Sequence, residues 1–548
     1  MDDLVEMSPM MAVNLGIRND RSEWDDLSPE GLDAIDEMRA RHRQAIDRLP
    51  PPIDRWDRLA REVAIEMIEE ERDEHARGED LRDLNSIASP FQLLRETLDL
   101  MPLDTPEDQD LVIRRIGSLD RFYQGLSASL EEGRRRGLTV ARRQVESVID
   151  QTAKLANEKG FQSLARRLPE DCAEQDRFAE AVAAAKAAAS DFGEYLRTSY
   201  LGASREADGV GEARYVTAAR GFLGCEIDPY EAYLWGWGEV SSLSERARSL
   251  ADQILPGSQP AEVVDMLRSD LEHAAANHDE FVKVMQDRQE AAVSALEGVH
   301  FDVPSEIRKI TINLAPPGTP LGAFYQSPSE DFSRPGGVWY ALPDDPHVPL
   351  YEEVSVAYHE GFPGHHLQIG TQMLMGDRLS RLHRTAVWYS GSGEGWALYA
   401  ERLMDELGYF ERPEYVLGMV VSHLLRACRV VIDIGCHVGY PVPDSAPIAG
   451  GEQWSFDLGV QVLERLAFQP HEYAVSEVTR YLGWPGQAIS YKLGERVILG
   501  LRESEKQRLG ERFSMRDFHD RVLEIGPVGL DLLTREISST TDQPAPRE

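Results

Sequence analysis

The sequence predicts a mainly α-helical protein with a small β element just before its most unusual motif. Apolar residues recur at helical spacing in long segments on both sides of residue 300. Short segments rich in β-branched and aromatic residues, bounded by proline and glycine, lie between residues 307 and 343. The chain has 548 residues, of which 28% are charged and 42% hydrophobic, an ordinary composition for a globular protein with a large core.

The first half of the chain is expected to form one helix after another. The segment GLDAIDEMRARHRQAIDRL (31–49) has helical periodicity and ends at three consecutive prolines, which stop a helix. The same pattern predicts helices over 56–75, 110–136, 177–200, 230–255 and 260–296. These segments have no fixed period, so a regular solenoid is not supported. We therefore expect a helical N-terminal region over residues 1–300.

The remainder of the chain is expected to combine the β element with further helices. IRKITINLAP (307–316) and GGVWYALP (336–343) read as strands, with a turn-rich loop between them. Helices resume from about residue 349 to 526. Residues 301–537 are thus predicted to form a second region. The polar, proline-containing tail, 538–548, is predicted to be disordered.

Charge and cysteine content exclude several classes of function. The formal net charge is −37, so nucleic acid and anionic membrane surfaces are unsuitable partners. The first residues have no basic segment followed by an apolar run, and no uninterrupted apolar stretch of about 18 residues occurs. The four cysteines form no CxxC pair, which excludes a zinc ribbon or a dithiol redox motif. These features predict a cytoplasmic protein that does not enter a membrane.

The segment YHEGFPGHHLQ (358–368) is similar to a zinc protease motif but has the wrong spacing. Zinc is held by imidazole nitrogens and carboxylates, and two histidines four residues apart share one face of a helix. Here the next histidines, His365 and His366, follow His359 by six and seven residues. On a straight helix the first would lie on the opposite side, and the second about 10.5 Å along the axis. Neither could share a metal with His359.

A helix break would remove this obstacle. Pro363 lacks an amide proton, and its ring would clash with the carbonyl of residue 359. Phe362, which precedes proline, is disfavoured in helical geometry, and glycines on both sides add freedom. We therefore predict a kink or bulge between Glu360 and His365 that brings a second histidine back towards His359. This reasoning leaves open whether His365 or His366 is that residue.

A third ligand is expected from a later helix. The segment SGSGEGWALYAERLMDELG (390–408) is amphipathic and begins with flexible glycines. Glu394 and Glu401 are seven residues apart and so share one face of this helix. One carboxylate can bind the metal while the other holds a ligand histidine through its free N–H.

Several motifs together resemble a known bacterial family. YHEGFPGHHLQ, GEGWALYAE (393–401) and WPGQAISYKLGE (484–495) are similar to the domain of unknown function 885. The resemblance extends to SPSEDFSRPGGVWYAL (327–342) and DIGCHVG (433–439), and covers most of residues 300–505.

That family in turn resembles gluzincin metallopeptidases, which implies a large α-helical metallopeptidase-like fold. Aligning the GH of their HExGH pattern makes His365 the second ligand, with two residues inserted after Glu360. Their ligand glutamate begins an E-x6-E stretch, which matches Glu394 and Glu401. The resemblance thus implies Zn²⁺ held by His359, His365 and Glu394.

The expected activity is zinc-dependent hydrolysis of peptide or amide bonds in short peptides or acyl-amides. Metal-activated water would attack the carbonyl, with Glu360 as the general base. An oxyanion needs a donor besides the metal. Tyr491 is the first candidate, because helical gluzincins use a residue from a late segment, and His437 is the second.

Substrate-binding residues are expected in three places. Strand 336–342, which contains Tyr340, is predicted to offer an edge to an extended substrate. Arg480 and Lys492 are candidates for binding a substrate carboxylate, although structural ion pairs are the favoured explanation for each. Two other functions fit: a small-molecule amidase or deacylase in a biosynthetic pathway, or an inactive, metallopeptidase-like binding protein. Retention of Glu360 argues against the binding protein, which needs no general base.

Overall fold

A computed structural model describes residues 1–17, 20–157, 160–169, 172–316, 322–376 and 378–539 of the chain. The chain divides into two compact units. Unit 1 comprises residues 1–208 with 482–484, and unit 2 comprises residues 209–481 and 485–548. The predicted mainly α-helical class with a small β element is confirmed. Most of the tail predicted to be disordered lies outside the described residues.

The boundary between the units differs from the one that the sequence suggested at residue 300. Helix α12 (Pro229–Ile254) packs along α19 (Pro413–Val438) within unit 2. Gly236 of α12 lies so close to Val430 and Val431 that a Cβ there would come within 3.0 Å of their side chains. The change of sequence character near residue 300 therefore marks the start of a sheet inside unit 2.

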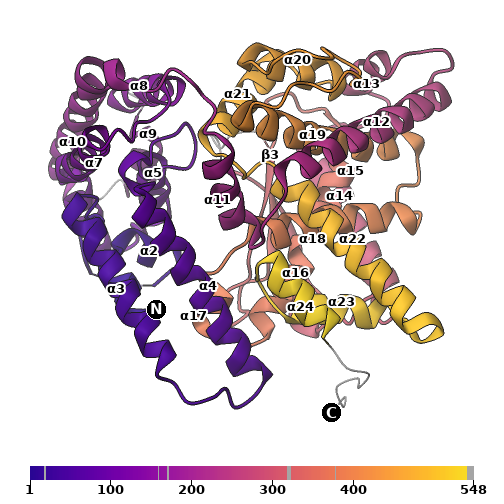
Figure 1. The fold of residues 1–548 in the computed structure, drawn as a ribbon, viewed down its shortest axis with the longest axis horizontal. Helices are drawn as coiled ribbons and strands as arrows, with labels where there is room; N and C mark the ends of the chain where they lie inside the picture. The colour runs from indigo at the N-terminus through magenta and orange to yellow at the C-terminus, as the bar shows by residue number, and fades with distance from the viewer. Residues whose placement is uncertain (18–19, 158–159, 170–171, 317–321, 377, 540–548) are drawn as a thin grey trace. The chain divides into compact units, whose positions relative to one another are not determined.

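Unit 1 consists of helices around an aromatic and aliphatic core (Figure 1). Tyr123 and Phe192 stack within it, with ring centroids 4.8 Å apart. The segment predicted as one helix over 110–136 is two helices that meet at Ser118. The helices are α1 (Asp2–Met7), α2 (Pro9–Asn14), α3 (Pro29–Asp47), α4 (Arg55–Arg77), α5 (Pro90–Leu100), α6 (Pro106–Gly117), α7 (Leu119–Arg135), α8 (Arg142–Ala156), α9 (Gln162–Arg167) and α10 (Gln175–Tyr195).

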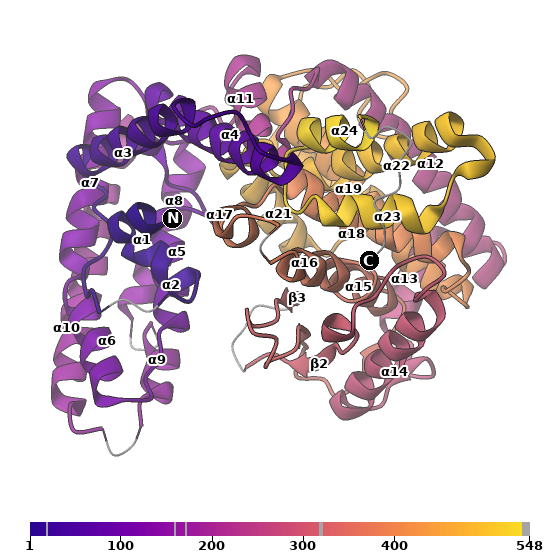
Figure 2. The same ribbon diagram turned by 90° about the horizontal axis from the view of Figure 1, so that it is seen from below.

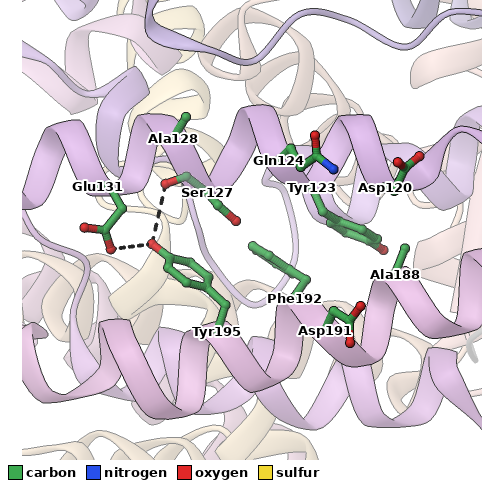
Figure 3. Close-up of a pocket in the computed structure, with 10 residues that line it drawn as sticks. All are labelled: Asp120, Tyr123, Gln124, Ser127, Ala128, Glu131, Ala188, Asp191, Phe192 and Tyr195. Atoms are coloured by element: carbon green, nitrogen blue, oxygen red, sulfur yellow. Dashed lines mark hydrogen bonds between the residues drawn. The ribbon is translucent and has the colours of Figure 1, made fainter.

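A cavity of about 430 Å³ lies between α7 and α10 of unit 1 (Figure 3). Its aromatic wall includes Phe192 and Tyr195, and Asp120 and Asp191 are among its acidic residues. The Tyr195 hydroxyl lies 2.9 Å from Glu131 Oε1, so this polar group already has a partner. No histidine lines the cavity, which separates it chemically from the histidine cluster described below.

Unit 2 contains the small sheets and the remaining helices. The helices are α11 (Glu212–Leu223), α12, α13 (Pro260–Arg268), α14 (His278–Leu296), α15 (Glu353–Glu360), α16 (His365–Leu374), α17 (Arg381–Thr385), α18 (Ser390–Glu406), α19, α20 (Phe456–Leu466), α21 (His471–Gly483), α22 (Ser490–Leu509), α23 (Met515–Glu524) and α24 (Leu530–Ser538). The strands are β1 (Ala274–Ala275), β2 (Thr311–Leu314), β3 (Gly322–Gln326), β4 (Gly337–Ala341) and β5 (Val348–Pro349).

The predicted helix over 260–296 is interrupted in the structure. Asp270 Oδ1 accepts hydrogen bonds from the backbone N–H groups of Glu272 and His273, which closes a turn after α13. Asn277 then caps α14 by accepting from the N–H of Glu280. Such side-chain bonds to the backbone compete with a continuing helix, and helical periodicity alone does not reveal them.

The larger sheet has the order β2-β4-β3, with β2 parallel and β3 antiparallel to β4. Both predicted strands are present, but β3 lies in the segment that we expected to be only a loop. Val338 and Tyr340 of β4 pack against Phe281 of α14 and belong to one core cluster with Ala357 of α15. Figure 2 shows the sheet beside α14, α15 and α16. The sheet thus supports the helix that carries the HEGFPGHH motif.

Helix α19 is long and apolar enough to cross a membrane by composition alone. However, 83% of its most apolar window is buried inside the protein. Two of its buried charged residues have internal partners: Arg429 pairs with Glu477, and Asp433 accepts a hydrogen bond from Tyr215. The helix therefore forms part of the core of unit 2.

Candidate metal centre

The HEGFPGHH segment is two helices joined by a short irregular link. Helix α15 ends at Glu360 and α16 begins at His365, so the predicted break is confirmed. Backbone groups in the link have specific partners: Gln289 Oε1 accepts from the Phe362 N–H at 2.6 Å, and Trp396 Nε1 donates to the Pro363 carbonyl at 3.0 Å. A Cβ on Gly364 would lie 2.0 Å from the carbonyl oxygen of His359, so this close turn requires glycine.

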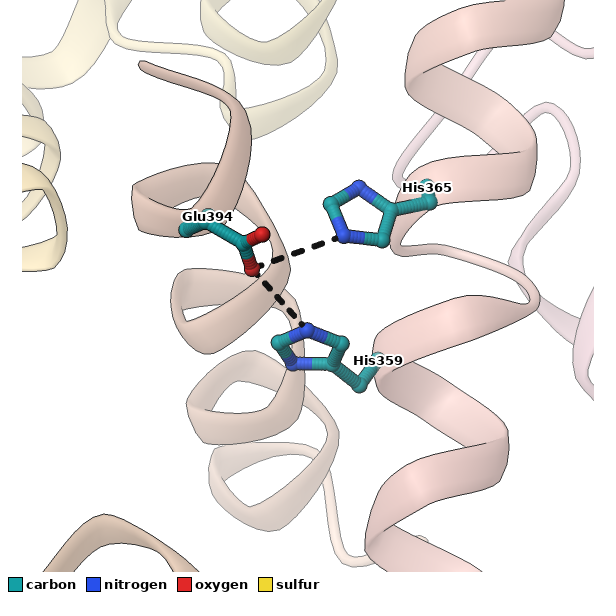
Figure 4. A group of neighbouring side chains, drawn as sticks. All are labelled: His359, His365 and Glu394. Atoms are coloured by element: carbon teal, nitrogen blue, oxygen red, sulfur yellow. Dashed lines mark ion pairs between the residues drawn. The ribbon is translucent and has the colours of Figure 1, made fainter. Parts of the chain in front are cut away.

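The break brings His359 and His365 together opposite Glu394 (Figure 4). Glu394 Oε2 lies 3.3 Å from His359 Nε2 and 3.7 Å from His365 Nε2. The two imidazole rings are nearly perpendicular, with centroids 5.0 Å apart. The predicted convergence of these three side chains is confirmed.

The donor atoms have the chemistry and spacing that a zinc ion requires. One ligand atom from each residue lies within 4.8 Å of the others. Ligands about 2.1 Å from a tetrahedral zinc are about 3.4 Å apart, close to the two N–O distances observed. Glu394 Oε2 is buried, and its described partners are these two imidazole nitrogens, so its charge is balanced only when a proton or a metal cation lies between them. His359, His365 and Glu394 therefore fit a bound cation.

The pKa values of His359 and Glu394 in the metal-free protein also show that this cluster favours a positive charge. Burial opposes the charged imidazolium of His359, but hydrogen bonds with Glu394 and Glu401 outweigh burial and raise its pKa to about 10. Burial also opposes the charged Glu394, yet His359 and His365 hold the pKa of its carboxyl below the usual range. A proton thus takes the place that a metal would hold, because a ligand histidine must be neutral.

Glu401 orients the first histidine. Its Oε1 lies 2.7 Å from His359 Nδ1, and its Oε2 accepts a hydrogen bond from the Ser355 hydroxyl. His423 Nε2 of α19 lies 3.5 Å from the same Oε2. An N–H on His359 Nδ1 directed at Glu401 leaves the Nε2 lone pair facing Glu394. The predicted position of Glu401 beside His359 is confirmed.

The ring of His365 is oriented by weaker contacts than the ring of His359. Its Nδ1 lies 3.3 Å from Gln368 Oε1, and the Gln368 side chain donates to the Ser392 carbonyl at 3.2 Å. Its ring also lies against Trp388, with centroids 6.0 Å apart. These contacts direct Nε2 of His365 towards Glu394.

His366 is engaged elsewhere. Its Nε2 donates to the Ile307 carbonyl at 2.6 Å, and the Tyr325 hydroxyl lies 3.0 Å from its Nδ1. Burial lowers the pKa of His366 to about 4, so the ring is neutral and accepts from Tyr325. With both nitrogens occupied, His366 ties α16 to β3, and of the two histidines that the spacing left open it is His365 that faces Glu394.

Glu360 and Tyr491 lie within electrostatic range of the cluster. Burial raises the pKa of Glu360, an effect that His359 and His365 partly offset. Burial also raises the pKa of the Tyr491 hydroxyl, and the charge of Glu394 raises it further. The Tyr491 ring lies beneath the guanidinium of Arg429, 4.9 Å from its centroid. The charges of this cluster therefore act on both residues.

A glycine contact explains how Tyr491 reaches this position. Helices α18 and α22 lie side by side (Figure 1). A Cβ on Gly494 would lie 1.8 Å from the Gly391 carbonyl oxygen and 2.8 Å from Gly395 Cα. Tyr491 precedes Gly494 by one helical turn, so this close approach brings it towards Glu394.

Comparison with known families identifies the chain. A model described as a bacterial protein of unknown function, DUF885, matches residues 9–537. The chain belongs to the DUF885 family. No curated protein matches it.

Two solved structures share the fold of this DUF885 chain. One, from Colwellia psychrerythraea and provisionally named a lipoprotein, is 23% identical, with a TM-score of 0.82. The alignment covers 98% of this chain and 96% of that one. The other, from Shewanella oneidensis, is provisionally named a lipoprotein of unknown function; it is 17% identical, with a TM-score of 0.74 and 98% coverage of both chains.

The expected oxyanion role of His437 is corrected by its place in the DUF885 fold. His437 follows His423 by fourteen residues on α19, or about 21 Å along the helix axis. Its Nε2 donates to the Tyr481 carbonyl at 2.9 Å, and its ring stacks on Tyr215. It is a core residue remote from Glu401.

The expected role of Tyr340 and its strand is also corrected. β4 is the central strand, with both edges paired, so it offers no edge to a substrate. The Tyr340 side chain is 1% exposed and packs edge-on against Phe281. Sequence alone does not distinguish a central strand from an edge strand here, because β3, its second neighbour, has the composition of a loop.

Arg480 and Lys492 have buried carboxylate partners. Arg480 Nε lies 3.0 Å from Glu477 Oε1. Lys492 Nζ lies 3.1 Å from Glu239 Oε2 and also pairs with Glu495. Both residues form structural ion pairs. The prediction that they bind a substrate carboxylate is therefore replaced by the other explanation given for them, structural ion pairing.

Sequence reasoning missed Ser355 and His423, which hold Glu401 in place. Ser355 precedes His359 by four residues and so lies on the same helix face, which is a usable signal. His423 has no such signal, because its distance from Glu401 depends on the packing of α19 against α18.

Proposed function

We propose that this protein is a zinc-dependent hydrolase of peptide or amide bonds in short peptides. The observation that carries the proposal is the convergence of His359 and His365 on the buried Oε2 of Glu394. The carboxylate of Glu401 behind His359 adds support, since ligand histidines commonly have such a partner. A gluzincin-like metallopeptidase fold is part of this proposal.

The roles of the side chains follow from their positions. His359, His365 and Glu394 would hold the ion. Zinc supplies Lewis acidity, which polarises the scissile carbonyl and acidifies water. Glu360 takes a proton from the attacking water and passes it to the leaving nitrogen. In the metal-free protein, burial raises the pKa of the Glu360 carboxyl. The Tyr491 hydroxyl donates to the oxyanion as it forms.

Glu360→Gln tests the role of the base. The amide keeps the size of the side chain but cannot accept the proton, so hydrolysis should fall by roughly 10²–10⁴-fold while zinc stays bound. The measurement is turnover of a peptide and acyl-amide pool by zinc-loaded protein, with zinc quantified in parallel. Glu511→Gln, at an exposed position in unit 2, is the matched control.

Two results would overturn the proposal. Unchanged turnover in metal-replete Glu360→Gln removes the general-base role. Wild-type protein that binds no zinc and cleaves no member of the pool favours the metallopeptidase-like binding protein. Cleavage of acyl-amides without any peptide would favour the small-molecule amidase or deacylase.

We also propose a cytoplasmic location and the absence of nucleic-acid partners, which the net charge of −37 supports. The two structural neighbours provisionally named lipoproteins make the cell envelope the alternative location. Fractionation of cells that express the full chain, followed by immunodetection, decides between the two. Recovery with the envelope would overturn the cytoplasmic location.

A further inference from the structure

Arg426 is a positive charge without a carboxylate partner in the most apolar helix of unit 2. Among the described residues its guanidinium forms no ion pair. Its Nη1 donates to the backbone carbonyl of Ser422 at 3.2 Å and to the Ser422 hydroxyl. Its Nε is buried and has no hydrogen-bond partner.

The neighbouring cations are all paired, which sets Arg426 apart. Arg429 lies 2.7 Å from Glu477, and Arg402 lies 3.2 Å from Glu495. Lys492 and Arg480 have the carboxylate partners described above. An arginine whose charge is needed only for folding would be expected to share one of these carboxylates, because a partly buried, unpaired charge is unfavourable.

Arg426 faces the metal-ligand cluster. It follows His423 by three residues, so the two side chains share one face of α19. His423 lies 3.5 Å from Glu401, which holds the ligand candidate His359. The Arg426 guanidinium carbon lies 5.9 Å from the ring centroid of Tyr491. Helix α19 thus presents a fixed cation to the residues of the proposed reaction.

We propose that Arg426 binds a carboxylate of the substrate through the Nε side of its guanidinium. An arginine fork suits this group, since two parallel N–H donors match the two oxygens of a carboxylate. The inference rests on the proposed hydrolase function and narrows it. The substrates would be short peptides or acyl-amino acids with a free carboxylate near the scissile bond.

The reaction remains a simple hydrolysis. The oxygen of water bonds to the scissile carbonyl carbon, and the C–N bond breaks. One proton of water passes through Glu360 to the leaving nitrogen, so the products are a carboxylic acid and an amine. When Arg426 holds a terminal carboxylate, the amine product is an amino acid or a short peptide cut from the C-terminus.

The test compares three sets of N-acetylated tripeptides on the zinc-loaded full chain. One set ends in a free carboxylate, one ends in an amide, and one ends in an amide but has Asp or Glu as its last residue. We expect wild-type kcat/KM to be about 10- to 100-fold higher for the first set than for neutral amides, the usual effect of a charge-assisted hydrogen bond. Arg426→Met should abolish this preference, and Arg426→Lys should retain part of it. Arg496→Met, which removes an exposed ion pair with Glu231, should behave as wild type.

Each outcome bears on the proposal. An Arg426-dependent preference for the acidic amides supports the site and makes the side chain the source of the carboxylate. Equal turnover of all sets by wild type, or an unchanged preference in folded Arg426→Met, overturns the proposal while the hydrolase stands. If nothing is cleaved, the hydrolase fails, and equilibrium dialysis of the same sets decides the anion site. In the dialysis, stronger binding of the peptides with a carboxylate than of the neutral amides by wild type, but not by Arg426→Met, supports the site. Equal binding of these peptides by wild type overturns it.

Discussion

At the cluster, one carboxylate oxygen faces two imidazole nitrogens, and neighbouring side chains determine which ring atoms do so. Glu401 accepts from His359, and Gln368 contacts His365, so each ring directs its Nε2 towards Glu394. Burial raises the pKa of Glu401, but His359 and His423 hold it well below the usual range. Glu401 thus stays ionised and keeps an N–H on Nδ1 of His359 directed towards itself.

The two adjacent histidines are predicted to differ in their effect on metal binding. His365→Ala removes one of three protein ligands, so zinc should be lost from the folded protein. His366→Gln should retain zinc and lose roughly 1–3 kcal/mol of stability, because buried hydrogen bonds to Ile307 and Tyr325 are disturbed. Zinc content of the folded fraction and thermal unfolding measure the two effects. Zinc loss in His366→Gln with full zinc in His365→Ala would reverse the assignment.

At the residue scale, the sequence identified the cluster better than its surroundings. His359 and His365 could be found because they flank a proline- and glycine-rich break between two helices, and Glu394 and Glu401 because they lie seven residues apart on a third. The partners of Arg480 could not, because an ion pair depends on which carboxylate the fold brings near it. Arg426 was missed for the opposite reason: its significance is the lack of a carboxylate partner, which only packing reveals.

At the scale of elements, the contact between α18 and α22 decides where Tyr491 lies relative to Glu394. Gly391 and Gly395 on one helix meet Gly494 on the other with no room for side chains. Close contact through glycine costs helix stability, since glycine is less favourable than alanine by roughly 0.5–1 kcal/mol in a helix interior. The positions of these glycines beside Glu394 indicate that the close contact serves the site.

Two glycines of α22 provide a matched test of this contact. Gly494→Ala would place a methyl group 1.8 Å from a backbone oxygen, so α22 must shift and stability should fall by about 1–3 kcal/mol or more. Gly500→Ala has nothing within 4 Å and should stabilise the helix by about 0.4–1 kcal/mol. Thermal unfolding of both variants gives the comparison. If Gly494→Ala changed the stability as little as Gly500→Ala does, the close contact would not be important for the packing of α22.

The sequence predicted most elements, and the misses have physical causes. Proline and glycine signals located the break between Glu360 and His365 correctly, because they act locally. Strand β3 was missed since its five residues are half-exposed and gain their partners only from β4. The interruption at Asp270 was missed because a side chain that caps a turn does not alter helical periodicity.

At the scale of the whole molecule, buried acids within unit 2 should make stability depend on pH. Burial raises the pKa of Asp433 to about 7, although Tyr215 and the Gly486 N–H stabilise the charged form. Because the pKa of Asp433 is higher in the folded state than its unfolded value of 3.8, the protonated carboxyl contributes to the stability of the folded protein. This contribution to stability is complete below pH 4 and is lost as the pH rises towards 7. The difference corresponds to at most about 4 kcal/mol.

Asp433→Asn should therefore flatten the pH dependence of unfolding. The amide resembles the protonated acid and does not titrate, so the variant should gain stability relative to wild type between pH 5 and pH 8. Denaturant unfolding at both pH values, with metal chelated, measures the change. Asp265→Asn, at an exposed position in α13, should give a curve parallel to wild type. A parallel curve for Asp433→Asn as well would show that its carboxyl does not titrate in this range.

Zinc should act on only one of the two units, because all three candidate ligands belong to unit 2. Ligand that binds only the folded state stabilises it by about 2.7 kcal/mol at 100 times Kd. Since the chain divides into two compact units, calorimetry should resolve two transitions, and zinc should raise the midpoint of one. Chelation should reverse the shift, and His359→Ala should abolish it. Hydrogen exchange assigns the transition, with protection by zinc expected in α15, α16 and α18 and no change in α7 or α10. A zinc-dependent shift that persists in His359→Ala, or protection confined to unit 1, would place the metal elsewhere.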